Sequence, residues 1–284
     1  MKEISFVKYS GAGNDFILID LSKNNFDNLS KDEISKLCKR HTGIGADGIL
    51  LFAESKNNDF NVQYFNADGS TGSICGNGAR CAIHYAKEQN IVKNKSVNFS
   101  SNKKKFTGEL LENDLIKFNL KPPEKIILNR KLKMGKFAFS FSFADTGSPH
   151  IVIDIAELIN IETGFPISDK LYELLVSKFG SEIRNNSAFA PEGVNVNFIQ
   201  YHENGLSMRT FERGVEAETL ACGTGAAAVA IIEAAKGLVD SPVSINTWGG
   251  DQLKIEFEIN NNMVNKLSLT GNAKQIYSGT VNTN

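Results

Sequence analysis

Two short segments of the chain pair a cysteine with closely spaced glycines. Cys75 begins Cys-Gly-Asn-Gly-Ala and Cys222 begins Cys-Gly-Thr-Gly-Ala, each just before a pattern typical of a helix. Glycine lets the backbone turn sharply and lets a ligand approach. The free N–H groups at a helix start attract a carboxylate and lower the pKa of a thiol placed there. We therefore interpret both cysteines as reactive, and Cys38 and Cys81, which lie within apparent helices, as packing residues.

Three kinds of chemistry use a pair of thiols: metal binding, disulfide exchange and proton transfer. Zinc and redox sites usually contain Cys-x-x-Cys, which is absent from this sequence, and no histidine pair completes a zinc set. An acid and a base on opposite faces of one carbon would remove a proton from one side and deliver another to the other side, which inverts the configuration. Two helix starts aimed at a carboxylate would share the developing charge. The pattern favours an amino-acid racemase or epimerase that uses neither a metal nor another cofactor.

The motifs occur twice in the same order. A glycine turn leading into a strand, Gly11–Ile17, precedes the first cysteine motif, and Thr146–Val152 precedes the second. Two similar halves predict a duplicated α+β unit. We expect two pseudo-twofold-related lobes, each a mainly antiparallel curved sheet around a central helix, with equivalent loops facing one another across a cleft.

Alternation and helical periodicity locate the individual elements. The segments that resemble strands are Glu3–Val7, Phe16–Asp20, Gly48–Glu54, Asn61–Asn66, Val97–Phe99, Lys105–Leu111, Leu115–Asn119, Lys136–Phe143, His150–Ile153, Val194–Gln200, Leu206–Thr210, Val243–Asn246, Leu253–Glu258, Met263–Thr270 and Lys274–Tyr277. The expected helices are Lys31–Arg40, Ala79–Gln89, Ser168–Lys178 and Gly225–Lys236. The first of them has Ser30 as its N-cap and Glu33 in the capping-box position.

A pair of prolines at 122–123 predicts the crossing between the lobes, because proline cannot continue a strand ladder. We expect the first lobe to contain residues 1–119 plus 272–284 and the second to contain residues 120–271.

Composition excludes several classes of protein. The formal net charge of −1 provides no general attraction for nucleic acid or for an acidic membrane surface. No apolar run reaches the roughly 18 residues of a membrane helix, and the N-terminus lacks the features of a signal peptide. We therefore expect a cytoplasmic protein whose four cysteines stay reduced.

Eight segments carry a resemblance to a known family: Gly11–Phe16, Thr42–Gly48, Tyr64–Ser70, Cys75–Cys81, Pro149–His150, Pro191–Val196, Glu212–Gly214 and Ala221–Gly225. With these segments the chain resembles the diaminopimelate epimerase family, which belongs to the PLP-independent amino-acid racemases, almost from end to end. The resemblance implies interconversion of LL- and meso-2,6-diaminopimelate in bacterial lysine and cell-wall synthesis. It also implies that Cys75 and Cys222 are the two catalytic acid/base groups, with His150 and Glu212 tuning the thiols.

The same resemblance implies a shell of substrate-binding residues. These are Asn14, Asn66, Gly76, Asn77, Asn195, Glu212, Arg213, Gly223 and Thr224. The three residues Asn14, Asn66 and Asn195 would hold the polar ends of the substrate, and backbone N–H groups after each cysteine would bind the reacting carboxylate. Two features depart from the commoner family pattern: Ser148 stands where many members have asparagine, and the stretch from Glu212 to Cys222 is one residue longer.

Other functions remain open at the level of the sequence. Within the superfamily, the alternative is a racemase of a different small amino acid or a phenazine-type isomerase. Outside it, the alternatives are a thiol redox protein, a metal-binding protein and a non-catalytic ligand-binding relative. The oligomeric state is also open, with a homodimer among the options.

Overall fold

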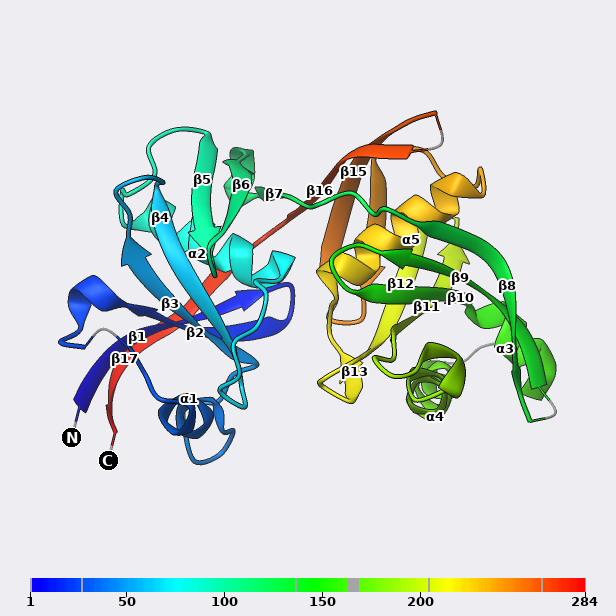
Figure 1. Cartoon of the computed structure of the whole chain (residues 1–284), viewed down its shortest axis with the longest axis horizontal. Coiled ribbons are helices and arrows are strands. Elements are labelled where there is room, and N and C mark those ends of the chain that lie inside the picture. The colour runs from blue at the N-terminus through cyan, green and yellow to red at the C-terminus, as the bar shows by residue number, and fades with distance from the viewer. Residues whose placement is uncertain are drawn as a thin grey trace. The chain divides into compact units, whose positions relative to one another are not determined.

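The computed structural model describes residues 2–26, 28–135, 137–162, 169–203, 205–261 and 263–283. The chain forms two compact units, one made of Met1–Asn119 with Thr270–Asn284 and the other of Leu120–Leu269. Within the described residues, each unit contains a sheet and a buried helix that packs against several of its strands (Figure 1).

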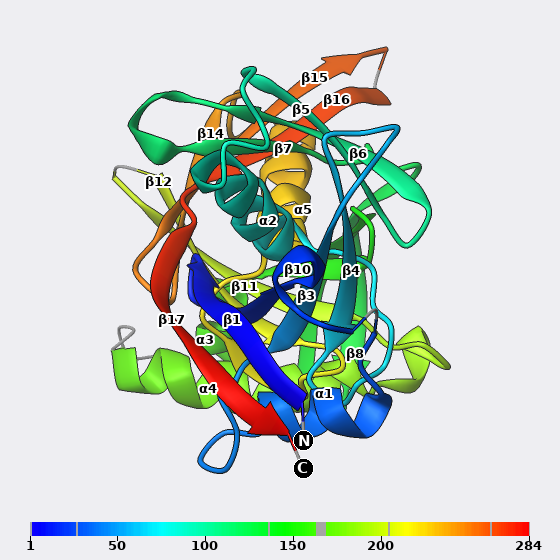
Figure 2. The same ribbon diagram turned by 90° about the vertical axis from the view of Figure 1, so that its left-hand side faces the viewer.

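The sheet of the first unit is built around the strands at the two ends of the chain. Its elements are β1 (Lys2–Gly11), β2 (Asn14–Asp20), α1 (Lys31–Cys38), β3 (Gly48–Glu54), β4 (Phe60–Asn66), α2 (Gly76–Glu88), β5 (Ser96–Ser101), β6 (Lys104–Leu110), β7 (Ile116–Asn119) and β17 (Lys274–Thr283). Strand β1 pairs antiparallel with β17 and with β2. Figure 2 looks onto this unit and shows β1 and β17 side by side. The order then continues β2-β3-β4-β5-β6-β7, in which β2·β3 and β4·β5 are parallel and the other pairs antiparallel.

The second unit has the same order of pairings. Its elements are β8 (Ile126–Met134), β9 (Phe137–Asp145), β10 (Pro149–Asp154), α3 (Ile155–Glu162), α4 (Asp169–Arg184), β11 (Asn195–His202), β12 (Gly205–Glu212), β13 (Ala217–Thr219), α5 (Gly223–Ala235), β14 (Val243–Thr247), β15 (Gln252–Asn260) and β16 (Met263–Gly271), whose last residues reach the first unit. The order β8-β9-β10-β11-β12-β14-β15 again contains two parallel pairs, β10·β11 and β12·β14.

This repeated pairing confirms the expected α+β fold of two lobes. In each unit two consecutive antiparallel pairs are followed by a parallel pair, an antiparallel pair and a second parallel pair. The described sheets are therefore mainly antiparallel, as predicted, with parallel pairs at matching places. The parallel pairs need crossover connections, and these bring α2 and α5 onto the sheets that they cover.

The central helices form for different local reasons. Helix α5 consists almost entirely of alanine, valine, isoleucine and glycine after its cysteine, and it is apolar on all sides, which is typical of a buried helix. Helix α2 is buried over most of its length although it contains Arg80 and Asn77. The peripheral α1 starts with the predicted capping box, because Ser30 and Glu33 exchange hydrogen bonds with each other's backbone.

Several predicted boundaries differ from the structure. Helix α1 ends at Cys38, two residues before the predicted end, because Lys39 adopts extended backbone angles. Strand β8 was not predicted, since a bulge and a positive φ at Asn129 interrupt its alternation. Helix α3 was not predicted either, because it follows β10 directly, with the Asp154 carboxylate accepting from the Ala156 N–H.

Two of the predicted elements begin outside the part of the chain that the structure describes. These starting residues are Lys136 and Ser168. Among the described residues, no helix is long and apolar enough to cross a membrane.

Candidate active site

Cys75 is the N-cap of α2. Its backbone is extended, and its Sγ accepts a hydrogen bond from the N–H of Gly78 at 3.3 Å. The residues of the first helical turn, Gly76 and Asn77, are buried, whereas Cys75 is partly exposed. A Cβ at Gly11 would lie 2.7 Å from the carbonyl oxygen of Asn77, so β1 approaches this helix start as closely as it does only because it has glycine there.

The predicted substrate-binding asparagines of the first unit have different surroundings. Asn77 Nδ2 donates to Asn14 Oδ1 at 2.6 Å, and Asn14 Nδ2 donates to Asp47 Oδ2 at 3.1 Å. Asn66 ends β4 and donates to the hydroxyl of Ser70 at 3.0 Å, within its own turn. The structure thus joins Asn14 to the start of α2 through Asn77, while the described contacts of the Asn66 side chain are local.

Next to Asn14 lies a cluster of charged side chains that was not predicted from the sequence: Lys8, Asp15, Arg40 and Asp47. Lys8 on β1 is buried and its Nζ lies 2.8 Å from Asp15 Oδ2. Arg40 donates to both oxygens of Asp15, at 3.0 and 2.8 Å, and to Asp47 Oδ1 at 2.9 Å. Burial alone would raise the pKa of Asp15, but hydrogen bonds and charges from Arg40 and Lys8 outweigh it and lower this pKa.

Cys222 is the N-cap of α5, in the place that corresponds to Cys75. Its Sγ lies 3.6 Å from the Thr224 hydroxyl, and it is 6% exposed. Burial raises the pKa of this thiol well above its ordinary value, and the nearby carboxylate of Glu212 raises it further. The expectation that the helix start lowers the thiol pKa is therefore wrong for Cys222, because desolvation of the thiolate outweighs the helix N–H groups.

Glycine is again required where the helix meets the sheet. A Cβ at Gly225 would lie 2.4 Å from Asn197 Oδ1 and 3.3 Å from Cys222 Sγ. Gly225 therefore lets the start of α5 pack closely against β11, in addition to leaving space for a ligand.

His150 lies fully buried beside this helix start. Its Nδ1 accepts from the Asn197 amide at 3.1 Å, and its Nε2 lies 2.9 Å from the hydroxyls of both Ser148 and Thr224. Asn197 also donates to the Ile151 carbonyl, so its amide nitrogen must face the imidazole and Nε2 must hold the ring proton. Burial and then the charge of Arg213 lower the pKa of His150 to about 3, so the ring is neutral near pH 7.

The end of β12 places the acidic and basic residues of the predicted shell. Glu212 Oε1 accepts from the Thr219 hydroxyl at 2.9 Å. Asn195 Oδ1 accepts from the backbone N–H of Arg213 at 2.9 Å, and its Nδ2 donates to the Pro149 carbonyl at 3.0 Å. Asn195 thereby ties the start of β10 to the end of β12.

The loop after β12 contains Glu216, which has a φ of 57°. Its carboxylate accepts from Arg184 on α4 at 2.9 Å and from the backbone N–H of Gly214 at 3.0 Å. The turn after Glu212 is therefore fixed to α4. The Ser148 hydroxyl lies within hydrogen-bond distance of His150, Thr224 and the Asn195 amide.

The second unit thus gathers Cys222, Thr224, His150 and Glu212 around one helix start. In the first unit, Gly76, Asn77 and Asn14 gather at the helix start capped by Cys75. Within the described ranges, no three His, Cys, Asp or Glu side chains form a group that could hold a metal ion.

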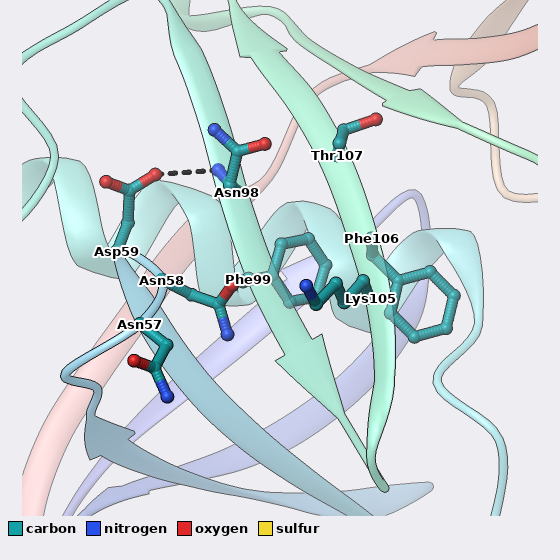
Figure 3. Close-up of a pocket in the computed structure, with 8 residues that line it drawn as sticks. All are labelled: Asn57, Asn58, Asp59, Asn98, Phe99, Lys105, Phe106 and Thr107. Carbon is teal, nitrogen blue, oxygen red and sulfur yellow. Dashed lines mark hydrogen bonds between the residues drawn. The ribbon is translucent and has the colours of Figure 1, made fainter.

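A cavity of about 470 Å³ in the first unit lies elsewhere (Figure 3). It is lined by Asn57, Asn58, Asp59, Asn98, Phe99, Lys105, Phe106 and Thr107. None of the predicted site residues is among them, and the Asp59 carboxylate is occupied by the Asn98 backbone N–H at 2.6 Å.

Solved structures of other proteins have the same fold. The crystal structure of a phenazine biosynthesis protein of the PhzF family from Bacillus anthracis aligns with a TM-score of 0.73 at 14% identity, covering 100% of both chains. A probable proline racemase from Agrobacterium radiobacter, solved with bound carbonate, aligns with a TM-score of 0.73 at 13% identity, covering 99% of this chain and 93% of the other. The fold is therefore the one shared by PhzF proteins and proline racemases.

Sequence comparison narrows this class to one family. Residues 6–126 and 142–276 match the profile of the family described as diaminopimelate epimerase. The diaminopimelate epimerase of Aquifex aeolicus is 38% identical over 288 residues, covering 97% of each chain, and that of Chlorobaculum tepidum is 38% identical over 275 residues, covering 96% of this chain and 99% of the other. The chain belongs to the diaminopimelate epimerase family and is an isomerase.

Proposed function

We propose that the protein interconverts LL- and meso-2,6-diaminopimelate by proton transfer between two thiols, Cys75 and Cys222, without a cofactor. The observation that carries the proposal is the duplication. In each unit a cysteine caps the central buried helix, α2 or α5, and is followed by Gly-x-Gly.

The proposed reaction moves one proton off a carbon and one proton onto it. One sulfur, as thiolate, takes the α-proton of the substrate, and the C–H electron pair stays on the carbon as a carbanion. The other sulfur, as thiol, gives its proton to the opposite face, and a new C–H bond forms with inverted configuration. No electron is gained or lost overall. The first backbone N–H groups of each helix, at Gly76-Asn77 and Gly223-Thr224, bind the α-carboxylate and stabilise the carbanion.

The contacts of Cys222 support a role as the resting proton donor. Its raised pKa keeps the thiol protonated near neutral pH in the protein without substrate. Burial is the largest cause of this raised pKa, and Glu212 is the side chain that raises it further. His150 acts on the thiol through Thr224, whose hydroxyl lies between the imidazole and the sulfur. Neutral His150 donates from Nε2, so it orients that hydroxyl without adding a charge.

The remaining predicted residues suit the distal end of diaminopimelate, which is a zwitterion. We propose that Arg213 binds its carboxylate and Glu212 its ammonium group, since guanidinium and carboxylate form strong charge-assisted hydrogen bonds. Asn14, Asn66 and Asn195 hold the polar ends of the substrate in this proposal, because an amide can donate to a carboxylate and accept from an ammonium group.

Substitution of the thiols tests the mechanism. Cys75→Ala and Cys222→Ala should each abolish epimerisation, and the serine variants should lose at least about a hundredfold in rate, because general acid–base catalysis contributes roughly 10²–10⁴. The matched controls are Cys38→Ala and Cys81→Ala, since both residues are buried and burial raises the pKa of each. Near-normal turnover by Cys75→Ala or Cys222→Ala would contradict the proposal.

Isotope incorporation tests the direction of proton flow. In deuterium oxide, the α-carbon of the product should carry deuterium before deuterium appears in recovered substrate, because the product receives its proton from a thiol that exchanges with solvent. Product free of deuterium at early turnover would exclude the two-thiol route. Metal analysis and thiol titration of the purified protein separate it from a metal-binding or disulfide-exchange protein.

Substrate profiling tests the choice of diaminopimelate. Turnover of this substrate with no activity on proline derivatives supports the proposal, and the reverse pattern would replace it with a proline-type racemase. We further propose a cytoplasmic role in lysine and peptidoglycan precursor synthesis. Restored growth of a bacterium that lacks diaminopimelate epimerase would support that role, and failure by the expressed, active protein would contradict it.

We also propose that the protein is a homodimer. The support is β17, on which the apolar side chains of Ile276 and Tyr277 are 51% and 45% exposed. Sedimentation equilibrium should give the mass of two chains, and a monomer at all concentrations would contradict this assembly.

A further inference from the structure

A continuous chain of hydrogen bonds in the first unit links two opposite charges through two amides. Arg80 Nη2 donates to Asn77 Oδ1 at 3.0 Å, Asn77 Nδ2 donates to Asn14 Oδ1 at 2.6 Å, and Asn14 Nδ2 donates to Asp47 Oδ2 at 3.1 Å. Each amide therefore accepts on the side of the cation and donates toward the anion. These four residues are called the amide relay below.

We infer that Asp47 and Arg80 are positioning residues, which fix the orientation of the side-chain amides of Asn14 and Asn77 and thereby the direction in which Asn14 faces the substrate. A carboxylate can only accept a hydrogen bond, and a guanidinium group can only donate. Turning either amide would set donor against donor and acceptor against acceptor, so the two end charges together allow one orientation. The inference rests on the proposed function, in which the side chain of Asn14 and the backbone N–H of Asn77 bind diaminopimelate.

The anionic end of the relay is held by other charges. Asp47 Oδ1 accepts from Arg40, and Arg40 is held by both oxygens of Asp15. Asp15 in turn is paired with the buried Lys8 and accepts from the backbone N–H of Asp47 at 3.0 Å. A carboxylate that is held on two sides cannot rotate away from Asn14 without breaking these bonds.

The cationic end is held by backbone groups. Arg80 is 0% exposed, and its Nε donates to the Asn272 carbonyl at 3.1 Å. Its Nη1 donates to the Gly76 carbonyl at 3.2 Å, in the first turn of α2. The relay is thereby fixed to the helix start whose N–H groups are proposed to bind the reacting carboxylate.

The relay organises the site before the substrate arrives. A primary amide has two N–H groups and two oxygen lone pairs, and the relay engages one of each on Asn14. The second N–H then points in a fixed direction and can bind the substrate without a further loss of side-chain freedom. Such preorganisation lowers the cost of binding rather than the barrier of the chemical step.

Asp47→Asn tests the relay at its more accessible end, where the side chain is 40% exposed. The new amide can present an N–H to Asn14, so the orientation is no longer enforced. We expect the KM for diaminopimelate to rise about tenfold with little change in kcat, as for the loss of one hydrogen bond to a charged group. Arg40→Gln removes the ion pairs of Arg40 with Asp15 and Asp47 but leaves the Asp47 carboxylate as the acceptor for Asn14. It should therefore raise KM less than Asp47→Asn does.

Asp114→Asn is the matched control, because it makes the same change in the same unit. Asp114 forms an exposed ion pair with Lys87, and its φ of 57° is one that asparagine tolerates. We expect KM and kcat of this variant to equal those of the wild type. An equal rise in KM in both aspartate variants would overturn the relay, because the effect would then be one of general charge.

A double-mutant cycle separates positioning from general support of the fold. If Asp47 acts through Asn14, then Asn14→Ala with Asp47→Asn should have the same KM as Asn14→Ala alone. Fully additive losses would overturn the inference, since they would show that Asp47 acts independently of that amide.

Nuclear magnetic resonance provides a readout that needs no turnover. The side-chain amide resonances of Asn14 and Asn77 should both shift in Asp47→Asn and stay unchanged in Asp114→Asn, in protein without substrate. Unmoved Asn77 resonances would overturn the relay. A wild-type protein that does not turn over diaminopimelate would overturn the proposed function and leave this test of the relay valid.

Discussion

Lowering the pH should destabilise the second unit through His150. The imidazole is fully buried, and its pKa is lowered to about 3, first by burial and then by the charge of Arg213. In the unfolded chain a histidine has a pKa of about 6.5. Above about pH 6.5 both states hold a neutral ring, so the stability contributed by this group is fully present. As the pH falls from about 6.5 toward 3, the ring binds a proton in the unfolded chain but stays neutral in the folded unit. The contribution of His150 to the free energy of unfolding is lost over this range.

The size of this effect follows from the two pKa values. At about pH 7.5 the ring is neutral in both states. Between about pH 6.5 and about pH 5 the unfolded state binds nearly one proton more than the folded state, which lowers the free energy of unfolding by about 1.36 kcal/mol for each pH unit. From about pH 7.5 to about pH 5 the free energy of unfolding therefore falls by about 2 kcal/mol. The folded pKa of about 3 lies well below this window, so the folded state contributes almost nothing to the difference.

The single tryptophan makes the assay specific. Trp248 lies in the second unit together with His150, so its fluorescence reports the unfolding of the unit that contains the buried ring. Urea unfolding of the wild type and of His150→Asn should be measured at both pH values. The substitution also removes packing, but that loss is common to both pH values and cancels in the difference for each variant.

The expected result is a pH difference about 2 kcal/mol smaller in His150→Asn than in the wild type. His202→Asn is the matched control, because His202 lies exposed at the end of β11 in the same unit. It should keep the wild-type difference. An unchanged difference in His150→Asn would refute the reasoning, since it would mean that the folded unit protonates this ring as readily as the unfolded chain does.

Two further changes test how the helix starts are built. Gly225→Ala should lower the free energy of unfolding by about 1–3 kcal/mol, as overpacking does, because its Cβ would lie 2.4 Å from Asn197 Oδ1. The same substitution at the equivalent Gly78 meets side-chain carbons at 3.5 Å and should cost much less, so equal losses in thermal unfolding would contradict this account. Ser30→Ala should cost about 1 kcal/mol by removing the hydrogen bond to the Glu33 backbone, measured by urea unfolding, with epimerase activity unchanged.

Much of the fold follows from local signals in the sequence. The two central helices were predicted because a segment of helical periodicity, which is a local signal, follows each cysteine motif. Each helix begins earlier than the apolar pattern, at Gly76 and Gly223, since the glycines themselves take part in the first turn. Strand β8 and helix α3 escaped prediction because their patterns are interrupted or merged with a neighbouring element.

The electrostatics of the site could not be predicted in the same way. Lys8, Asp15, Arg40 and Asp47 come together through the pairing of β1 and β2 and the loop before β3, so no short motif contains them. The pKa of Cys222 depends on burial, which the helix-start rule does not include, and the prediction for this thiol was therefore wrong. The catalytic roles of Cys75 and Cys222 and the binding role of Asn14 stay predictions, which the variants above test.

The two copies of the cysteine motif have diverged in the groups that support them. Behind the first helix start, charged residues such as Asp47 and Arg80 hold amides in place. At the second helix start, the neutral imidazole of His150 is hydrogen-bonded to hydroxyl groups and to the amide of Asn197. Cys222 is buried beside Glu212, whereas Cys75 is partly exposed. Inversion by two thiols needs one sulfur with its proton and one without, which two identical surroundings would not favour. Under the proposed mechanism, the duplication provides acid and base at matching helix starts, and the divergence around them allows the two thiols to differ in protonation before the substrate binds.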